Sequence, residues 1–127
     1  RFLHGYAISF RVWFEGELDH RNWVWDFGGM KRSKTQINGM SPKDYFTWLL
    51  DHTTVIAMDD PHLESFKQLS SEGLIQLRII PATGCEKFAE HLYTKINTFL
   101  KEETEGRVKA VLVEVYEHEK NSASYGQ

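Results

Sequence analysis

Residues 107–118 read RVKAVLVEVYEH and have the pattern of a β-strand. Its odd positions hold Val111, Val113 and Val115, and Glu117 continues the same series. Because side chains alternate between the two faces of a strand, the series predicts a buried face that ends in a carboxylate. A buried carboxylate needs a cation or a ligand with N–H donors, unless the strand end frays and leaves Glu117 in water. Glu117 is therefore a candidate binding residue.

A long amphipathic helix precedes this strand. Residues 83–86 read TGCE and have the form of a capping box, in which Thr83 starts the helix and Glu86 reaches back to it. The apolar residues that follow have helical spacing: Phe88, Leu92, Ile96, Phe99 and Leu100. The pattern predicts a helix that packs on a sheet, joined to the last strand by the charged linker 101–106.

Three further stretches are expected to be strands. Residues 4–15 alternate with period two, and His4 and Tyr6 begin the apolar face. Residues 22–27 are a second short strand that forms a hairpin with the first, and residues 74–80 alternate again. The tail from residue 121 to residue 127 is small and polar, and we expect it to be loose.

Two helices fall between the second and third strands. Ser41 and Pro42 begin one of them, and the other follows Pro61 and ends at Gly73. With helices gathered on one side of antiparallel strands, the order predicts an α+β fold with a four-stranded antiparallel sheet. Such a sheet has open edges, which neighbouring subunits in a ring could close.

The first of these helices ends in an adjacent carboxylate and imidazole, Asp51 and His52. A carboxylate can hold an imidazole in one tautomer and raise its basicity, which makes a histidine a proton shuttle near neutral pH. The alternative is that His52 only neutralises the last carbonyl groups of the helix. The dipeptide alone leaves both interpretations open.

Bulk composition restricts the class of protein. A chain of 127 residues fits one domain, and a net charge of −3 without a basic run gives nucleic acid no electrostatic footprint. No apolar run approaches the length of a membrane span. The single cysteine, Cys85, favours a reducing compartment and hence the cytoplasm. The chain starts at Arg1, close to its first strand, and we expect residues to precede it.

Four stretches, in this order, resemble the family of 6-pyruvoyltetrahydropterin and 6-carboxytetrahydropterin synthases. Residues 3–6 (LHGY) are similar to the family's L-H-G-H-x-Y strand, and residues 26–31 (DFGGMK) to its D-F-x-x-L-K motif. Residues 50–52 (LDH) match L-D-H, and residues 115–117 (VYE), with Ala123 and Tyr125 downstream, are similar to V-x-E-T and A-x-Y. Residues 83–86 look like a variant of the P-T-x-E helix start.

The resemblance implies a tunnelling fold, in which β-β-α-α-β-β subunits form a barrel-like ring, a hexamer or another ring size, with active sites between subunits. It implies that Asp51 and His52 are the proton-relay pair. It implies that Glu117 accepts hydrogen bonds from the amino and ring N–H groups of a pterin. These groups would be the N–H donors that a buried carboxylate needs. Contacts with the substrate are also implied for Phe27, Cys85 and Glu86, although Glu86 as a cap and Cys85 as a small buried residue are the alternatives.

A zinc site is implied as well, with His4 as one of three histidine ligands; a purely structural histidine is the alternative. Tyr6 stands where the family has its second strand histidine, and His118 replaces the threonine after the anchoring glutamate. The family's remaining zinc histidine and its catalytic cysteine would precede Arg1.

Three hypotheses follow. The first is a metal-dependent lyase that acts on 7,8-dihydroneopterin triphosphate and gives 6-carboxy-5,6,7,8-tetrahydropterin, the precursor in queuosine-type synthesis, or eliminates triphosphate as 6-pyruvoyltetrahydropterin synthase does. The second is a pterin- or purine-binding homologue without catalysis. The third is a structural ring-forming domain.

Overall fold

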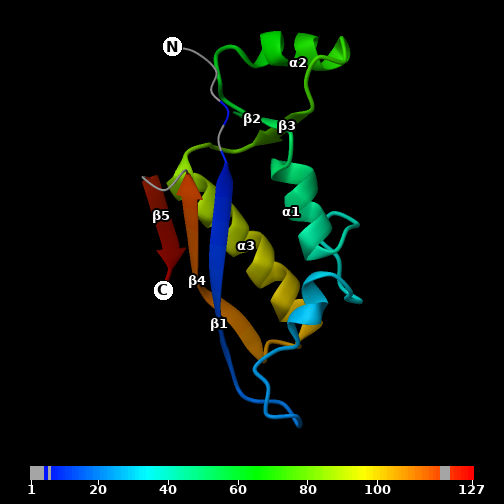
Figure 1. Ribbon diagram of the computed structural model, residues 1–127, viewed down its shortest axis with the longest axis vertical. Coiled ribbons are helices and arrows are strands. Elements are labelled where there is room, and N and C mark those ends of the chain that lie inside the picture. Colours follow the sequence, from blue (N-terminus) through cyan, green and yellow to red (C-terminus); the bar gives the residue numbers. More distant parts are fainter. Residues whose placement is uncertain (1–4, 6, 118–120) are drawn as a thin grey trace.

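The computed structural model describes residues 5, 7–117 and 121–127 (Figure 1). The predictions for His4, Tyr6 and His118 lie outside these residues. The elements, in chain order, are β1 (Ile8–Gly16), the 3-10 helix η1 (Phe27–Met30), α1 (Pro42–Leu50), β2 (Thr54–Ala57), α2 (Leu63–Ser71), β3 (Leu77–Ile80), α3 (Cys85–Glu103), β4 (Val108–Glu117) and β5 (Asn121–Gly126).

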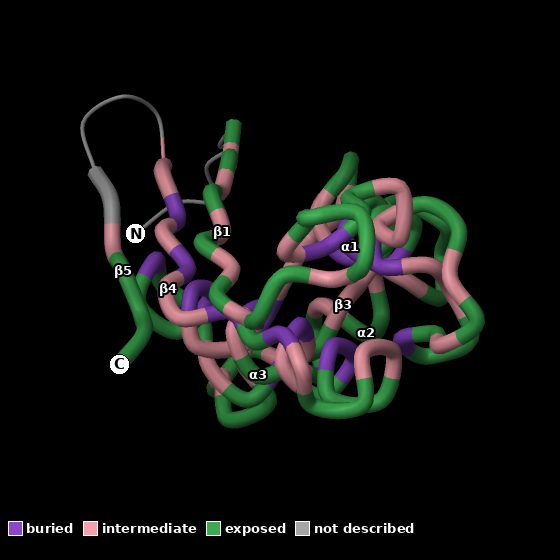
Figure 2. Tube along the Cα trace, turned by 90° about the horizontal axis from the view of Figure 1, so that it is seen from below, coloured by how far each residue is buried: buried purple, intermediate pink, exposed green. Residues whose placement is uncertain are grey.

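The main sheet is antiparallel and has the strand order β1-β4-β5. Helix α3 packs along β4 and β5, and α1 lies on the far side of α3 from most of the sheet (Figure 1). In Figure 2 the three strands stand on one side of the molecule, and α1 stands with β3 and α2 on the other. The α+β class with helices on one face of an antiparallel sheet is confirmed, whereas the membership of the sheet differs from the predicted four strands.

The stretch predicted as the third strand of this sheet belongs to a separate one. β3 pairs in parallel with β2, and α2 is the crossover between them. The alternation of residues 74–80 placed Ile79 on the apolar face, but Ile79 is exposed and its neighbour Ile80 is buried. Parallel pairing requires a crossover connection, which the predicted helix after Pro61 supplies.

The predicted strand at residues 22–27 is wrong. The Arg107 guanidinium donates to the carbonyl oxygens of Glu17 and Val24, so these backbone groups are satisfied without a strand ladder. Trp25 is buried, and its ring packs against Phe14 of β1 and Phe99 of α3. The aromatic residues that gave the stretch its strand character therefore anchor a loop to the core.

The expectation of a loose tail is also wrong. Residues 121–126 form β5, which adds an antiparallel edge to β4. Ala123 packs against the core, and the Tyr125 ring lies edge-on to Tyr93 of α3, with 4.8 Å between the ring centroids. Small polar residues suit an edge strand whose other face is open to water.

A β-bulge in the β1–β4 ladder decides which face of β4 is buried. Trp13 pairs with Leu112 and Phe14 with Ala110, so Val111 has no partner residue in β1. Before the bulge the even residues Val108 and Ala110 are buried, and after it the odd residues take over. The prediction of a buried odd face is thus confirmed for Val113 and Val115 and wrong for Val111, which is only half-buried.

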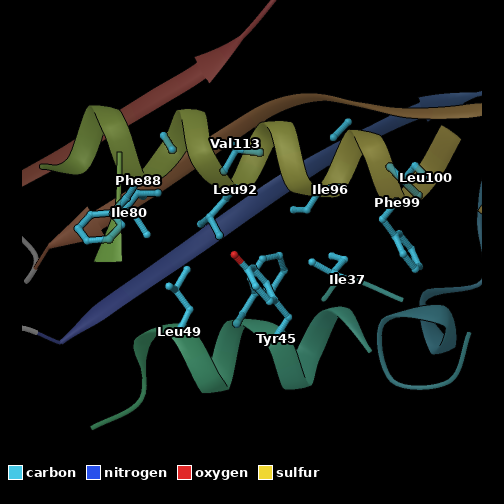
Figure 3. Close-up of a cluster of buried hydrophobic side chains, with 14 of the residues drawn as sticks. Ile37, Tyr45, Leu49, Ile80, Phe88, Leu92, Ile96, Phe99, Leu100 and Val113 are labelled. Carbon is cyan, nitrogen blue, oxygen red and sulfur yellow. The ribbon is translucent and has the colours of Figure 1, made fainter. Parts of the chain in front are cut away.

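The core lies between α1, α3 and the sheet. Figure 3 shows Tyr45 and Leu49 of α1 pointing toward Leu92 and Ile96 of α3. These four side chains are at most 2% exposed. Burying an aliphatic side chain of this size stabilises a fold by about 1.5–3 kcal/mol. The contact therefore fixes α1 against α3. None of the helices in the described residues combines the length and apolarity needed to cross a membrane.

Candidate functional site

One large cavity, of about 1080 Å³, opens at the end of the molecule where β1 begins, α1 ends and α3 begins. Its wall is built from the start of β1, one face of α1, the segment 51–56, the start of α3 and the end of β4. Asp51, His52 and Glu117 all line it. The structure therefore brings Glu117 together with the Asp51–His52 pair, which is far from it in the sequence.

Glu117 reaches the cavity because it continues the face of Val113 and Val115 after the bulge. Its side chain is half-buried at the last position of β4, opposite Ile8 of β1. The Cys85 thiol donates a hydrogen bond to its Oε2 atom, with 3.3 Å between sulfur and oxygen. The Glu117 carboxylate thus lines a cavity, as the interpretation of a ligand-binding residue requires. Among the described residues, its Oε1 atom has no hydrogen-bond donor.

Cys85 itself is buried and does not line the cavity. Burial and the hydrogen bond to the Glu117 carboxylate raise the pKa of the thiol to about 11, with burial the larger cause. A thiol with such a pKa is neutral near pH 7, and the neutral form is a poor nucleophile. Cys85 therefore touches the candidate anchor and is not a nucleophile, in keeping with the alternative that made it a small buried residue.

The start of α3 differs from the predicted capping box. The N-cap residue is Gly84, with φ +103°, and no described side chain caps the helix. A left-handed φ suits glycine, and it moves the helix start one residue beyond the predicted N-cap, Thr83. The first N–H groups of a helix have no partner within the helix. Thr83 and Gly84, the two residues that lead into α3, line the cavity, so the start of the helix borders it.

Asp51 and His52 end α1 as predicted. Asp51 is the C-cap residue, and His52 follows with φ +53°. A non-glycine residue in this region stores about 1–2 kcal/mol of strain, which is typical of functional positions. His52 Nε2 lies 3.8 Å from Asp51 Oδ1, and the side chains are 87% and 63% exposed. The pair is therefore adjacent and free to move, but not held by a short hydrogen bond.

Phe27 and Glu86 do not line the cavity. Phe27 lies in η1, where its ring packs beside Phe14 and Trp25 and remains 64% exposed. From the same short helix, Met30 reaches the cavity wall instead. The sequence motif therefore lies near the site, but a different residue of it faces the cavity.

Lys43 is a lining residue that the sequence interpretation missed. It stands in the first turn of α1, and Phe46, Thr47 and Leu50 continue the same lining face toward Asp51. The spacing i, i+3, i+4, i+7 marks one face of a helix, so the signal was present in the sequence. With a rise of about 1.5 Å per residue, Lys43 lies roughly 12 Å along the helix axis from Asp51.

The described residues were compared with what a zinc ion needs. They contain no group of three or more histidine, cysteine, aspartate or glutamate side chains that could hold a metal. His4, the predicted ligand, is outside the described residues, although its neighbour Gly5 lines the cavity. The described part of the chain does not make up a zinc site by itself.

A large cavity that joins a carboxylate, the approach to a helix N-terminus and an Asp–His pair is typical of a small-molecule site on an α+β fold. The family model described as 6-pyruvoyl tetrahydropterin synthase matches residues 1–127, and the chain belongs to this family. Membership supports an enzyme, broadly a pterin-related lyase.

Among solved structures, the chain is similar to an uncharacterized protein, WS1659, from Wolinella succinogenes. The TM-score is 0.77 at 19% sequence identity, over 100% of this chain and 80% of that one. This likeness supports the fold. No curated protein sequence matches the chain significantly.

Proposed function

We propose that the protein is a lyase that acts on 7,8-dihydroneopterin triphosphate and forms 6-carboxy-5,6,7,8-tetrahydropterin. The observation that carries the proposal is that Glu117, the Asp51–His52 pair and the residues Thr83 and Gly84 before α3 line one cavity. Elimination of triphosphate alone, as in 6-pyruvoyltetrahydropterin synthases, would use the same groups.

Recognition follows from complementary hydrogen bonding. A pterin presents an amino group and a ring N–H side by side, with a carbonyl next to them. The Glu117 carboxylate offers acceptors for the two donors, and the free N–H groups at the start of α3 offer donors for the carbonyl. One edge of the heterocycle is thereby satisfied in a cavity whose wall also contains Phe10, Phe46 and Phe88.

Proton transfer is assigned to His52. Its imidazole is the one histidine side chain among the described cavity residues, and Asp51 beside it stabilises the protonated form. A proton taken from the three-carbon side chain of the substrate can return to it from the same nitrogen. Lys43, farther along α1, provides a positive charge for the triphosphate.

The zinc ion implied by the family resemblance is part of the proposal, with His4 as one ligand. When bound, zinc would polarise the side-chain oxygens of the substrate.

A ring of subunits is also proposed. β1 and β5 are the edges of the described sheet, and His52 is 87% exposed, so a neighbouring subunit would cover both a sheet edge and the Asp51–His52 pair. Because Cys85 is a free thiol, the proposed compartment is the reducing cytoplasm.

The test uses the full-length protein. We expect neopterin binding, stoichiometric zinc and turnover of dihydroneopterin triphosphate. Glu117→Gln should weaken neopterin binding by about 2–3 kcal/mol, the scale for a charged partner in a buried hydrogen bond. Glu114→Gln, on the other face of β4, is the matched control. Equal neopterin affinities of the two variants would exclude Glu117 as the anchor.

The second candidate is a pterin- or purine-binding protein without catalysis. It is favoured by Tyr6, which stands in place of a zinc histidine of the family. Neopterin binding without stoichiometric metal and without turnover would select this candidate.

A further inference from the structure

The hydrogen bond between Cys85 and Glu117 joins two elements at the mouth of the site. Cys85 is the first residue of α3, and Glu117 is the last residue of β4. Their side chains meet through Sγ and Oε2 at 3.3 Å. The sulfur is buried and outside the cavity wall, whereas the carboxylate is part of that wall. The thiol therefore contacts the carboxylate from its protein side.

We infer that Cys85 is a positioning residue for Glu117: its thiol donates to Oε2 and thereby turns the carboxylate so that its remaining acceptor sites face the ligand. A carboxylate at a strand end has free side-chain torsions, and ordering a glutamate side chain costs conformational entropy. A donor that fixes one oxygen before the ligand arrives removes part of this cost from binding. The inference rests on the proposed function, in which Glu117 anchors a pterin.

The thiol suits this role because of its protonation state. A neutral thiol is a donor, whereas a thiolate beside a carboxylate would repel it. Burial and the Glu117 carboxylate keep the proton on sulfur, with the pKa at about 11. The pair therefore stays intact through the neutral pH range.

The first experiment measures neopterin affinity by titration calorimetry. Cys85→Ala removes the donor and should weaken binding roughly three- to tenfold, the effect of one neutral hydrogen bond. Cys85→Ser keeps a donor and should restore affinity to within about twofold of the wild-type protein. Ser124→Ala is the matched control, because the Ser124 hydroxyl of β5 also donates to a carboxylate of β4, that of Glu114, and neither residue lines the cavity. Wild-type affinity in Cys85→Ala, or no rescue by serine in a folded variant, would overturn the inference.

The second experiment needs no ligand. Cys85 is the only cysteine of residues 1–127, and mass analysis of the peptide that contains it measures the rate at which iodoacetamide alkylates this thiol. Glu117→Gln should speed alkylation at pH 8.5 roughly three- to tenfold, because the thiolate becomes easier to form. Glu114→Gln should leave the rate unchanged. Equal alkylation rates in the two variants would overturn the inference. If the wild-type protein binds no neopterin, but Glu117→Gln is alkylated faster than Glu114→Gln, only the pterin function is refuted.

Discussion

The Asn97 side chain of α3 forms hydrogen bonds with both backbone polar groups of Ala110 in β4. Asn97 Oδ1 accepts from the Ala110 N–H at 2.8 Å, and Asn97 Nδ2 donates to the Ala110 carbonyl at 3.0 Å. Ala110 precedes the bulge at Val111, where the β1–β4 ladder is interrupted. The Asn97 amide thus satisfies the backbone at the point where the buried residues of β4 change from even to odd positions. Because of this change, Glu117 lies on the face that lines the cavity.

Asn97→Ala should lower the free energy of unfolding by about 2–3 kcal/mol, because two backbone groups of the buried Ala110 lose their partners. Urea unfolding monitored by tryptophan fluorescence measures the change. Thr98→Ala is the control, since the Thr98 hydroxyl bonds only to the Thr94 carbonyl of its own helix, and we expect less than about 0.5 kcal/mol there. Similar losses in both variants would contradict the role of Asn97 at the bulge.

His52→Gly should raise stability by about 0.5–1 kcal/mol, whereas His52→Ala should not, because only glycine relieves the left-handed φ of +53°. Both variants lack the imidazole, and both should lose turnover far more than neopterin affinity. Thermal unfolding and single-turnover assays measure the two effects. Equal loss of binding and turnover would instead mark His52 as structural.

Lys43→Gln should weaken binding of dihydroneopterin triphosphate about fivefold and leave binding of neopterin unchanged, because only the former carries phosphate charge. The difference should shrink as salt is added. Lys109→Gln, which removes an exposed lysine of β4 away from the cavity, is the control for net charge. A loss of affinity for both ligands would place Lys43 at the heterocycle and not at the phosphates.

Stability at alkaline pH should depend on Cys85. Burial, with the Glu117 carboxylate as a second cause, raises the pKa of the thiol from 9.0 in a free chain to about 11. As the pH rises, the unfolded chain therefore loses this proton before the folded chain does. The stabilisation that comes from the buried neutral thiol is complete below pH 9 and is lost between pH 9 and pH 11. Two pKa units correspond to about 2.7 kcal/mol.

Wild-type protein should accordingly lose about 2 kcal/mol more stability than Cys85→Ala between pH 8 and pH 11 in urea unfolding. Tyrosine and lysine residues titrate in both proteins, so the comparison isolates the thiol. Parallel pH profiles for the two proteins would show that the thiol titrates alike in the folded and unfolded chains.

Local sequence signals predicted the helices well. Ser41 caps α1 by accepting from the Asp44 N–H, and the apolar stripe of α3 is buried as its spacing required. These features depend on residues three or four positions apart, whose geometry a helix fixes by itself. The same holds for the alternation of β1, whose even residues face the core.

Strand pairing was predicted less well. Residues 22–27 have strand composition, but Arg107, more than 80 positions away, satisfies the Val24 carbonyl. The tail is mostly small and polar, yet it pairs with β4 as β5, and Tyr125 packs against Tyr93 of α3. Pairing partners come from distant parts of the chain, and composition carries little information about them.

By itself, the sequence determined the α+β class, the long helix before the last strand and the chemical character of Asp51, His52 and Glu117, because periodicity and side-chain chemistry are local properties. The tertiary structure alone places these three residues in one cavity, brings Thr83 and Gly84 to its wall and joins Cys85 to Glu117. A β-bulge, a glycine φ and the packing of α1 on α3 set those positions. Each depends on contacts between segments that the chain order leaves far apart.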